Sequence, residues 1–281
     1  MYKFNFLAEV INGDRFRSVA DVVVDRGLTI YQKEYILSRP CIIFCKTDFL
    51  NELFEFIREI KKTHLYILIT HNSDYPIDQN RYMKKPVNIV KWYALNVACA
   101  AHNLVPIPSG MERPLGMGYS SDPAILADRL KCDRNRQNLV YMNHNANNNH
   151  YERDFVTEHA KQFDWCTWKN HGVSFHDYIK NVYEHDFVLS PPGNGIDCHR
   201  TWESLYMGTV PIVKHSILTN FFRDLPMLIV EDWSILSKEV LEYALCEIKE
   251  IEYDYSKLTF SYWKKRIYED AFELLPEWSD A

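Results

Sequence analysis

The sequence has no long apolar run. Its longest apolar windows, such as LYILIT, are far shorter than the roughly 20 residues that a membrane-spanning helix needs. The N-terminal stretch MYKFNFLAEVINGDRF also lacks the apolar block of a signal peptide. We therefore expect a soluble protein without a membrane span, located in the cytoplasm.

Runs of a single charge are missing as well. Acidic and basic residues are interleaved along the chain, and the formal net charge is -6. A groove that binds nucleic acid usually shows a basic stretch. We therefore expect no nucleic acid among the partners of this protein.

Cysteine and histidine patterns typical of metal sites are absent from the sequence. The closest of the seven cysteines are Cys41 and Cys45, and no second pair completes a zinc site. None of the eleven histidines belongs to a His-x-x-x-His pattern. The sequence predicts reduced thiols and no bound metal.

Short apolar runs alternate with amphipathic stretches along the sequence. No Gly-x-Gly-x-x-Gly motif follows the first predicted strand, which argues against a dehydrogenase. We predict strands at 41–45, 65–70, 87–96, 104–110, 138–145, 186–192, 210–213 and 225–230. We predict helices at 47–62, 98–103, 150–163, 175–185, 199–208 and 260–275.

Strands and helices in this order predict an α/β protein with parallel sheets that helices cover on both faces. The polar stretch 117–137 interrupts the alternation, which then starts again. We expect a Rossmann-like N-terminal domain over 1–116, a linker over 117–137 and a second Rossmann-like domain over 138–260. The helix in 261–281 is expected to pack back across both domains.

One segment carries the clearest chemistry: LSPPGNGIDCHRTWESLYMGTVPIV, Leu189 to Val213. Two prolines end a strand there, and Gly193 and Gly195 let a ligand approach the backbone closely. A helix that begins near Asp197 would present unpaired N–H groups and a partial positive charge. The segment therefore predicts a binding site for an anion.

Two charged residues follow in the same predicted helix. Arg200 in the first turn is suited to bidentate binding of phosphate, and Glu203 lies one turn further along the same face. The alternative is purely structural: a surface turn, a helix capped by Asp197, and an ion pair between Arg200 and Glu203.

This segment resembles the donor-binding segment of exostosin-type glycosyltransferases, in which a strand, a Pro/Gly turn, an arginine, an acidic residue and a Gly-x-[Ile/Val]-Pro-[Ile/Val] strand recur. The stretches NLVYMNHNANNNHYERDFV, LPMLIVEDWSIL and KLTFSYWKKRI extend the resemblance. It covers the chain from about Asn138 to the C-terminus well and the first half loosely. Within that family the chain looks most like the small soluble enzymes of chlorella viruses that build capsid glycans.

The resemblance implies the GT-B architecture, in which two Rossmann-like domains face each other across a cleft. It implies that the C-terminal half binds a nucleotide sugar, the N-terminal half binds a glycan acceptor, and the sugar is transferred with inversion and without a metal. The sequence accordingly has no Asp-x-Asp pair. Arg200 would bind the diphosphate, Glu203 the ribose, and His199 would contact phosphate.

The resemblance also implies the co-substrate and further contacts to the donor. No cofactor is expected beyond a UDP-sugar, with UDP-xylose as donor and a fucose of a viral capsid glycan as acceptor. The loops after two strands supply the other expected donor contacts: Ser190, Gly193, Asn194, Gly195, Asp197, Asn143 and Arg153. For the Asn-rich loop 142–153, a surface turn is the alternative.

Inverting transfer needs a base that takes a proton from the acceptor hydroxyl, and we expect it in the N-terminal half. Asp74 and His71 follow the strand 65–70 and are the first and second candidates. Glu112, after the strand 104–110, is the third, and Asp14 is a weaker one. A turn-forming aspartate and a hydrogen-bonded histidine are the structural alternatives.

Two rival functions stay open at this point. One is a non-catalytic protein that binds a nucleotide or a carbohydrate, and it predicts donor binding without turnover. The other is a UDP-sugar epimerase of the same architecture, and it predicts release of UDP without an acceptor.

Overall fold

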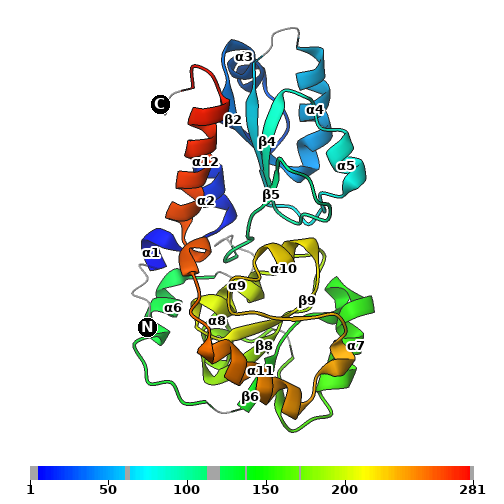
Figure 1. Ribbon diagram of the computed structural model, residues 1–281, viewed down its shortest axis with the longest axis vertical. Helices are drawn as coiled ribbons and strands as arrows, with labels where there is room; N and C mark the ends of the chain where they lie inside the picture. Colours follow the sequence, from blue (N-terminus) through cyan, green and yellow to red (C-terminus); the bar gives the residue numbers. More distant parts are fainter. Residues whose placement is uncertain (1–5, 61–63, 113–120, 137, 171, 279–281) are drawn as a thin grey trace. The chain divides into compact units, whose positions relative to one another are not determined.

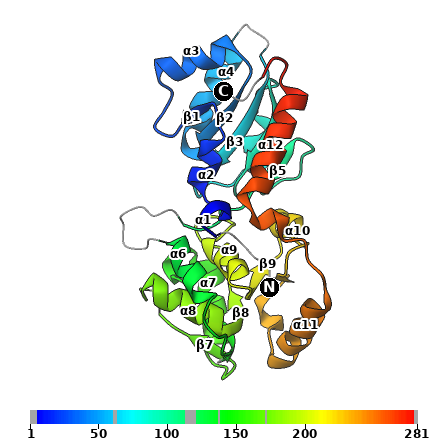
Figure 2. The same cartoon turned by 90° about the vertical axis from the view of Figure 1, so that its left-hand side faces the viewer.

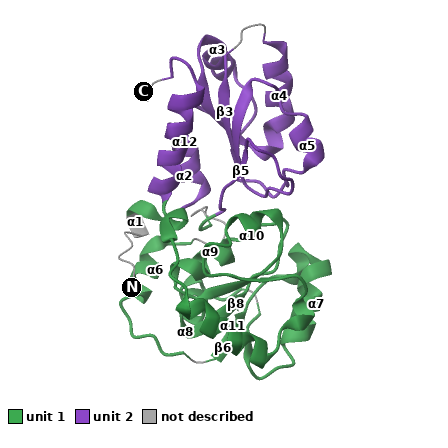
Figure 3. Ribbon diagram, viewed as in Figure 1, with its two compact units in different colours: residues 1–10, 110–259 green, residues 11–109, 260–281 purple. Residues whose placement is uncertain are grey.

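The computed structural model is a mixed α/β protein with two five-stranded parallel sheets (Figure 1). The residues that it describes are 6–60, 64–112, 121–136, 138–170 and 172–278. Figure 3 shows the two compact units into which the chain divides, each built from two segments. Unit 1 comprises residues 1–10 and 110–259, and unit 2 comprises residues 11–109 and 260–281.

The sheet of unit 2 has the order β1-β2-β3-β4-β5, which follows the chain. Its strands are β1 (Val22–Val24), β2 (Cys41–Lys46), β3 (Tyr66–His71), β4 (Ile89–Ala94) and β5 (Leu104–Pro106). Both β2 and β3 are apolar along nearly their whole length, because helices bury both faces of a parallel sheet. The strands predicted in the first half of the chain are confirmed, β4 and β5 with narrower bounds, whereas β1 was not predicted.

Helices cover this sheet on both sides (Figures 1 and 2). The helices of unit 2 are α2 (Gly13–Ser18), α3 (Ile30–Ser38), α4 (Leu50–Glu59), α5 (Gln79–Met83) and α12 (Phe260–Leu274). In α4, Leu53, Phe54 and Ile57 share one face and pack into the core beside Trp92. The helix predicted near 47–62 is therefore confirmed with narrower bounds.

The helix predicted at 98–103 is wrong. The residues between β4 and β5 form bends and turns. Asn96 adopts a left-handed conformation with φ 56°, and Ile77 and Val97 form a parallel bridge. The Ala98 N–H donates to the Ile77 oxygen at 2.9 Å, so the bridge takes up the start of the predicted helix, and a turn closed by Leu104 N–H and the Ala101 oxygen (3.2 Å) leads into β5.

The sheet of unit 1 has the order β10-β9-β8-β6-β7. Its strands are β6 (Asn138–Met142), β7 (Cys166–Trp168), β8 (His185–Leu189), β9 (Val210–Lys214) and β10 (Leu228–Val230). The chain runs outward from β6 to β7, and then returns to the other side of β6 to form β8, β9 and β10. The order therefore reverses between β6 and β8, and ligands of such sheets bind at the carboxyl ends of the strands at this point.

The helices of unit 1 are α1 (Phe6–Glu9), α6 (Pro123–Arg129), α7 (His150–Ala160), α8 (Phe175–Glu184), α9 (His199–Tyr206), α10 (Ile217–Phe221) and α11 (Lys238–Glu250). Residues of α7 and α11 pack against one face of the sheet, while α8 and α9 contact β8. The predicted helices 150–163, 175–185 and 199–208 are confirmed in α7, α8 and α9.

The observed units have other boundaries than the predicted domains. The helix α6 lies in the stretch 117–137, which we expected to be a linker, but it packs against α1 and α8 inside unit 1. Residues 113–120 and 137 of that region lie outside the described residues. The helix α12, which we expected to pack across both domains, belongs to unit 2.

Two contacts fix α12 to the sheet of unit 2. The Tyr93 hydroxyl of β4 donates to the Asp270 carboxylate at 2.5 Å, and Nζ of Lys91 lies 3.2 Å from the same carboxylate. The side chains of Trp263, Ile267 and Ala271 are fully buried. Within the described residues, no helix is long and apolar enough to cross a membrane.

Candidate functional site

Most of the predicted donor-site residues meet at one place in unit 1. Asn143 and His144 follow β6, and the loop that begins at Ser190 follows β8 and leads into α9. These two strands are neighbours at the point where the strand order reverses. The topology therefore places the two loops together at the carboxyl edge of the sheet.

Arg153 of α7 organises the Pro/Gly loop after β8. Its side chain is buried, and it donates to the backbone oxygens of Pro192 (2.9 Å), Asn145 (2.8 Å) and Pro191 (3.3 Å). A Cβ on Gly193 would lie 2.7 Å from Nη2 of Arg153, which explains the glycine at that position. Arg153 thus holds the loop in place with the donors that we had assigned to a ligand.

The helix α9 begins at His199, as in the predicted helix 199–208 and two residues after Asp197, and its N-cap Cys198 makes no capping hydrogen bond with its side chain. Asp197 accepts from the backbone N–H of Cys198 at 2.8 Å and from Nε1 of Trp202 at 2.7 Å. The carboxylate therefore joins the loop to the helix and does not cap it. The Ser190 hydroxyl makes a hydrogen bond of 2.8 Å with the Thr201 hydroxyl, which adds a second link.

Arg200 differs from Arg153 because its charge is not compensated. No hydrogen bond or ion pair joins its guanidinium group to another side chain among the described residues, and its Nε is buried without a partner. The ion pair between Arg200 and Glu203 that the structural alternative required is not formed. A partly buried cation without a counter-ion at a helix N-terminus is an arrangement that favours binding of an anion.

Glu203 is buried, and it interacts with other residues of unit 1. Its Oε1 accepts a hydrogen bond of 3.1 Å from the Ser121 hydroxyl. Burial raises the pKa of Tyr178, and the charge of Glu203 raises it further. The carboxylate that we expected to bind ribose therefore already has protein partners.

His144 is a site residue that we did not predict from the sequence. Its side chain is 7% exposed, and burial together with the charges of Arg200 and Arg153 lowers its pKa to about 3. The imidazole is therefore neutral at physiological pH. Its position directly after Asn143 at the end of β6 is the signal that could have identified it.

The remaining predicted donor residues differ in their contacts. The amide of Asn143 donates to the backbone oxygens of Lys169 (3.1 Å) and Asn170 (2.8 Å), and so connects the loops after β6 and β7. Nδ1 of His199 donates to the Gly110 oxygen at 2.8 Å. Asn194 is exposed, and the Gly193 N–H donates to the Gly195 oxygen at 3.0 Å.

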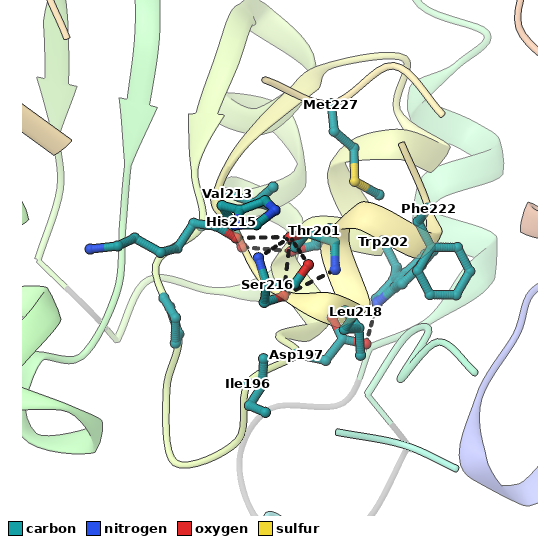
Figure 4. Close-up of a pocket in the computed structure, with 14 residues that line it drawn as sticks. Ile196, Asp197, Thr201, Trp202, Val213, His215, Ser216, Leu218, Phe222 and Met227 are labelled. Atoms are coloured by element: carbon teal, nitrogen blue, oxygen red, sulfur yellow. Dashed lines mark hydrogen bonds between the residues drawn. The ribbon is translucent and has the colours of Figure 1, made fainter. Parts of the chain in front are cut away.

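A pocket of about 230 Å³ adjoins the same helix (Figure 4). Trp202, Leu218, Phe222 and Met227 supply its apolar lining. The polar lining comes from the loops after β8 and β9, from the end of β9 and from the helices α9 and α10: Ser190, Asp197, Thr201, Lys214, His215, Ser216 and Thr219. Figure 4 shows the Trp202 indole bonded to Asp197 at the edge of this pocket.

The candidate bases do not share one unit. His71 is buried in unit 2, where its Nε2 bonds the Pro108 oxygen (3.1 Å) and its Nδ1 accepts from the Asn72 N–H (2.8 Å). Asp74 follows it and is exposed. Glu112, expected in the N-terminal domain, is exposed and belongs to unit 1. Asp14, the weaker candidate, is also exposed and belongs to unit 2. Of the three candidates in unit 2, only His71 is buried.

The comparisons with known proteins do not identify the chain. A scan against protein-family models finds no match, and no curated protein matches the sequence. The resemblance to exostosin-type glycosyltransferases therefore stays a prediction that rests on the quoted segments. Among the described residues, no group of three or more His, Cys, Asp or Glu side chains is arranged to hold a metal ion.

Proposed function

We propose that the protein is an inverting, metal-independent glycosyltransferase of the GT-B type that moves a sugar from a UDP-sugar to a hydroxyl of a glycan. The observation that carries the proposal is the uncompensated charge of Arg200 at the start of α9, next to the reversal of strand order in unit 1. A diphosphate would supply the missing counter-charge. The adjoining pocket offers room for an uncharged part of the same ligand.

In the proposed reaction, a hydroxyl of the acceptor attacks the anomeric carbon of the donor sugar. The bond between that carbon and the diphosphate oxygen breaks, and UDP leaves with the bonding electrons. Arg200 and the N–H groups of α9 stabilise the negative charge of the leaving diphosphate. Asp74 accepts the proton of the attacking hydroxyl. UDP-xylose and a fucose-bearing glycan are the substrates that the resemblance suggests.

The first test is the thermal unfolding of wild type and Arg200→Ala with UDP and several UDP-sugars, with and without EDTA. A ligand at about 100 times its Kd stabilises the folded state by about 2.7 kcal/mol. We expect UDP to raise the Tm of wild type without metal and to have little effect on Arg200→Ala. Arg223→Ala is the control, because this exposed arginine of unit 1 lies outside the site.

Measuring UDP release with and without an acceptor distinguishes a glycosyltransferase from an epimerase and from a binding protein. A glycosyltransferase releases UDP from the donor only with an acceptor, and Asp74→Asn should abolish the release while donor binding persists. Release of UDP without an acceptor would identify an epimerase or a hydrolase. Binding without turnover for every acceptor would favour a binding protein, and no response of wild type to any nucleotide would refute the donor site.

A further inference from the structure

Four buried polar atoms near the start of α9 have no hydrogen-bond partner in the part of the chain that the structure describes. They are the hydroxyls of Tyr141 in β6 and Tyr178 in α8, Nδ1 of His144 after β6, and Nε of Arg200. Arg153 connects the loop after β6 with the start of α9, because it donates to the Asn145 oxygen (2.8 Å) and to Sγ of Cys198 (3.6 Å). The charge of Arg200 acts on Tyr141, Tyr178 and His144. Because buried polar atoms are nearly always hydrogen-bonded, we expect a bound ligand to supply the hydrogen-bond partners of these atoms.

The hydrogen bonds around His144 determine which of its ring nitrogens carries the proton. The Thr157 hydroxyl lies 2.7 Å from the backbone oxygen of Arg153, which can only accept, so the hydroxyl donates its single proton there. The contact of 2.9 Å between Nε2 of His144 and the same hydroxyl must then be donated by the imidazole. Nδ1 therefore bears a lone pair and is an acceptor.

The charges around this acceptor define what it can bind. Arg200 and Arg153 are the cations that lower the pKa of His144, so the ring stays neutral beside them. Arg200 and Tyr141 offer hydrogen-bond donors, and His144 offers an acceptor. A bare anion satisfies only the donors. A ligand that carries both an anionic group and a hydroxyl satisfies all three.

We propose that Nδ1 of His144 accepts a hydrogen bond from a hydroxyl of the ligand whose phosphate binds Arg200, and so selects a hydroxyl-bearing phosphate ester over a bare anion. The inference rests on the proposed function for the presence of such a ligand, and it adds a recognition residue to the site. The hydroxyl belongs either to the ribose or to the transferred sugar. Thr157 is the positioning residue that orients the ring.

Two substitutions separate the functions of the two ring nitrogens. In His144→Gln, the side-chain NH₂ replaces Nε2 as the donor to Thr157, but the acceptor at Nδ1 is lost. In His144→Asn, the side-chain oxygen replaces Nδ1, and the donor to Thr157 is lost. The Gln variant therefore tests ligand recognition, while the Asn variant serves as its matched control.

The measurement is the Kd of the full-length protein for UDP, UDP-xylose and inorganic sulfate, which carries no proton at neutral pH. We expect His144→Gln to raise the Kd of a hydroxyl-bearing ligand roughly tenfold and to leave sulfate binding unchanged. His144→Asn keeps the acceptor but loses the bond to Thr157, so it should raise the Kd less than His144→Gln does. A rise for UDP assigns the contact to ribose, and a rise for UDP-xylose alone assigns it to the sugar.

Equal affinities of His144→Gln and wild type, or equal losses in both variants, overturn the inference. If UDP binding still depends on Arg200 in that case, the donor site stands and only the assignment of His144 fails. If neither UDP nor UDP-xylose binds wild type, both proposals fail. Should His144→Gln not fold, the ¹⁵N resonance of Nδ1 in wild type decides: it shifts on addition of UDP or UDP-xylose if the bond forms, and an unchanged resonance contradicts it.

Discussion

At the scale of single residues, the site contains two arginines in opposite states. Arg153 donates to three backbone oxygens and holds the loop after β8, while Arg200 has no partner among the described side chains. Both residues were predicted to contact the donor. Hydrogen bonding distinguishes them, because an arginine whose donors are satisfied by the protein has little left to offer a ligand.

The low pKa of His144 predicts an acid-sensitive stability. The imidazole accepts a proton at about pH 6.5 when the chain is unfolded and near pH 3 when it is folded, so the unfolded state binds more protons between these values. Stability is therefore lost as the pH falls through this window, by about 2 kcal/mol between pH 7 and pH 5. Burial also lowers the pKa of His185, so His144→Gln keeps part of the acid sensitivity. Urea unfolding should show a loss that is larger in wild type than in His144→Gln by about this amount. Equal losses in both proteins would argue against a neutral buried imidazole.

At the scale of elements, the start of α9 depends on Asp197 and Trp202. Replacing Asp197 with Ala leaves the Trp202 indole N–H without its acceptor, and we expect a loss of about 1–3 kcal/mol in the free energy of unfolding. In a Trp202→Phe background this N–H is absent, so Asp197→Ala should cost less. Urea unfolding of the four proteins measures the difference. Identical costs in both backgrounds would show that the bond adds nothing to stability.

A comparison of the predicted with the observed helices and strands shows which parts of the fold follow from the sequence. The buried strands β2 and β3 are nearly continuous apolar runs, and β6 and β8 contain shorter ones at their carboxyl ends. The amphipathic helix α4 has a clear periodicity, so both kinds of element were predicted. The edge strand β7 has only three residues, none of them buried, and gave no such signal. The helix predicted at 98–103 failed because a bridge to Ile77 outweighs the local preference for helix.

The sequence likewise predicts one part of the candidate site and not the other. The loop after β8, its glycines and Arg200 could be predicted, because Pro and Gly mark turns in a sequence and a charged residue next to such a turn is easily recognised. The protonation state of His144 could not be predicted, because it depends on Thr157 and Arg153 of α7 and on Arg200 of α9. The division into units could not be predicted either, because each unit joins segments that lie far apart in the sequence.

At the scale of the whole molecule, unit 2 depends on the last helix of the chain. Trp263 of α12 is fully buried, and its ring packs edge-on against Phe16 of α2. Trp263→Ala should cost about 3–5 kcal/mol and accelerate amide exchange in β2, β3 and β4 far more than in unit 1. Phe272→Ala on the same helix is the control, because Phe272 is 64% exposed. Equal acceleration in both units would contradict a local role of the helix.

The division into units also sets an order of completion during synthesis. The chain passes from one unit to the other three times, at residues 10/11, 109/110 and 259/260. All segments of unit 1 have been synthesised once Thr259 is added, whereas unit 2 still lacks α12 at that stage, although all five strands of its sheet precede those of unit 1 in the chain. Because domains fold as units while the ribosome adds residues, the sheet that is synthesised first belongs to the unit that is completed last. Until then, the face of its sheet that α12 covers lies open on the nascent chain.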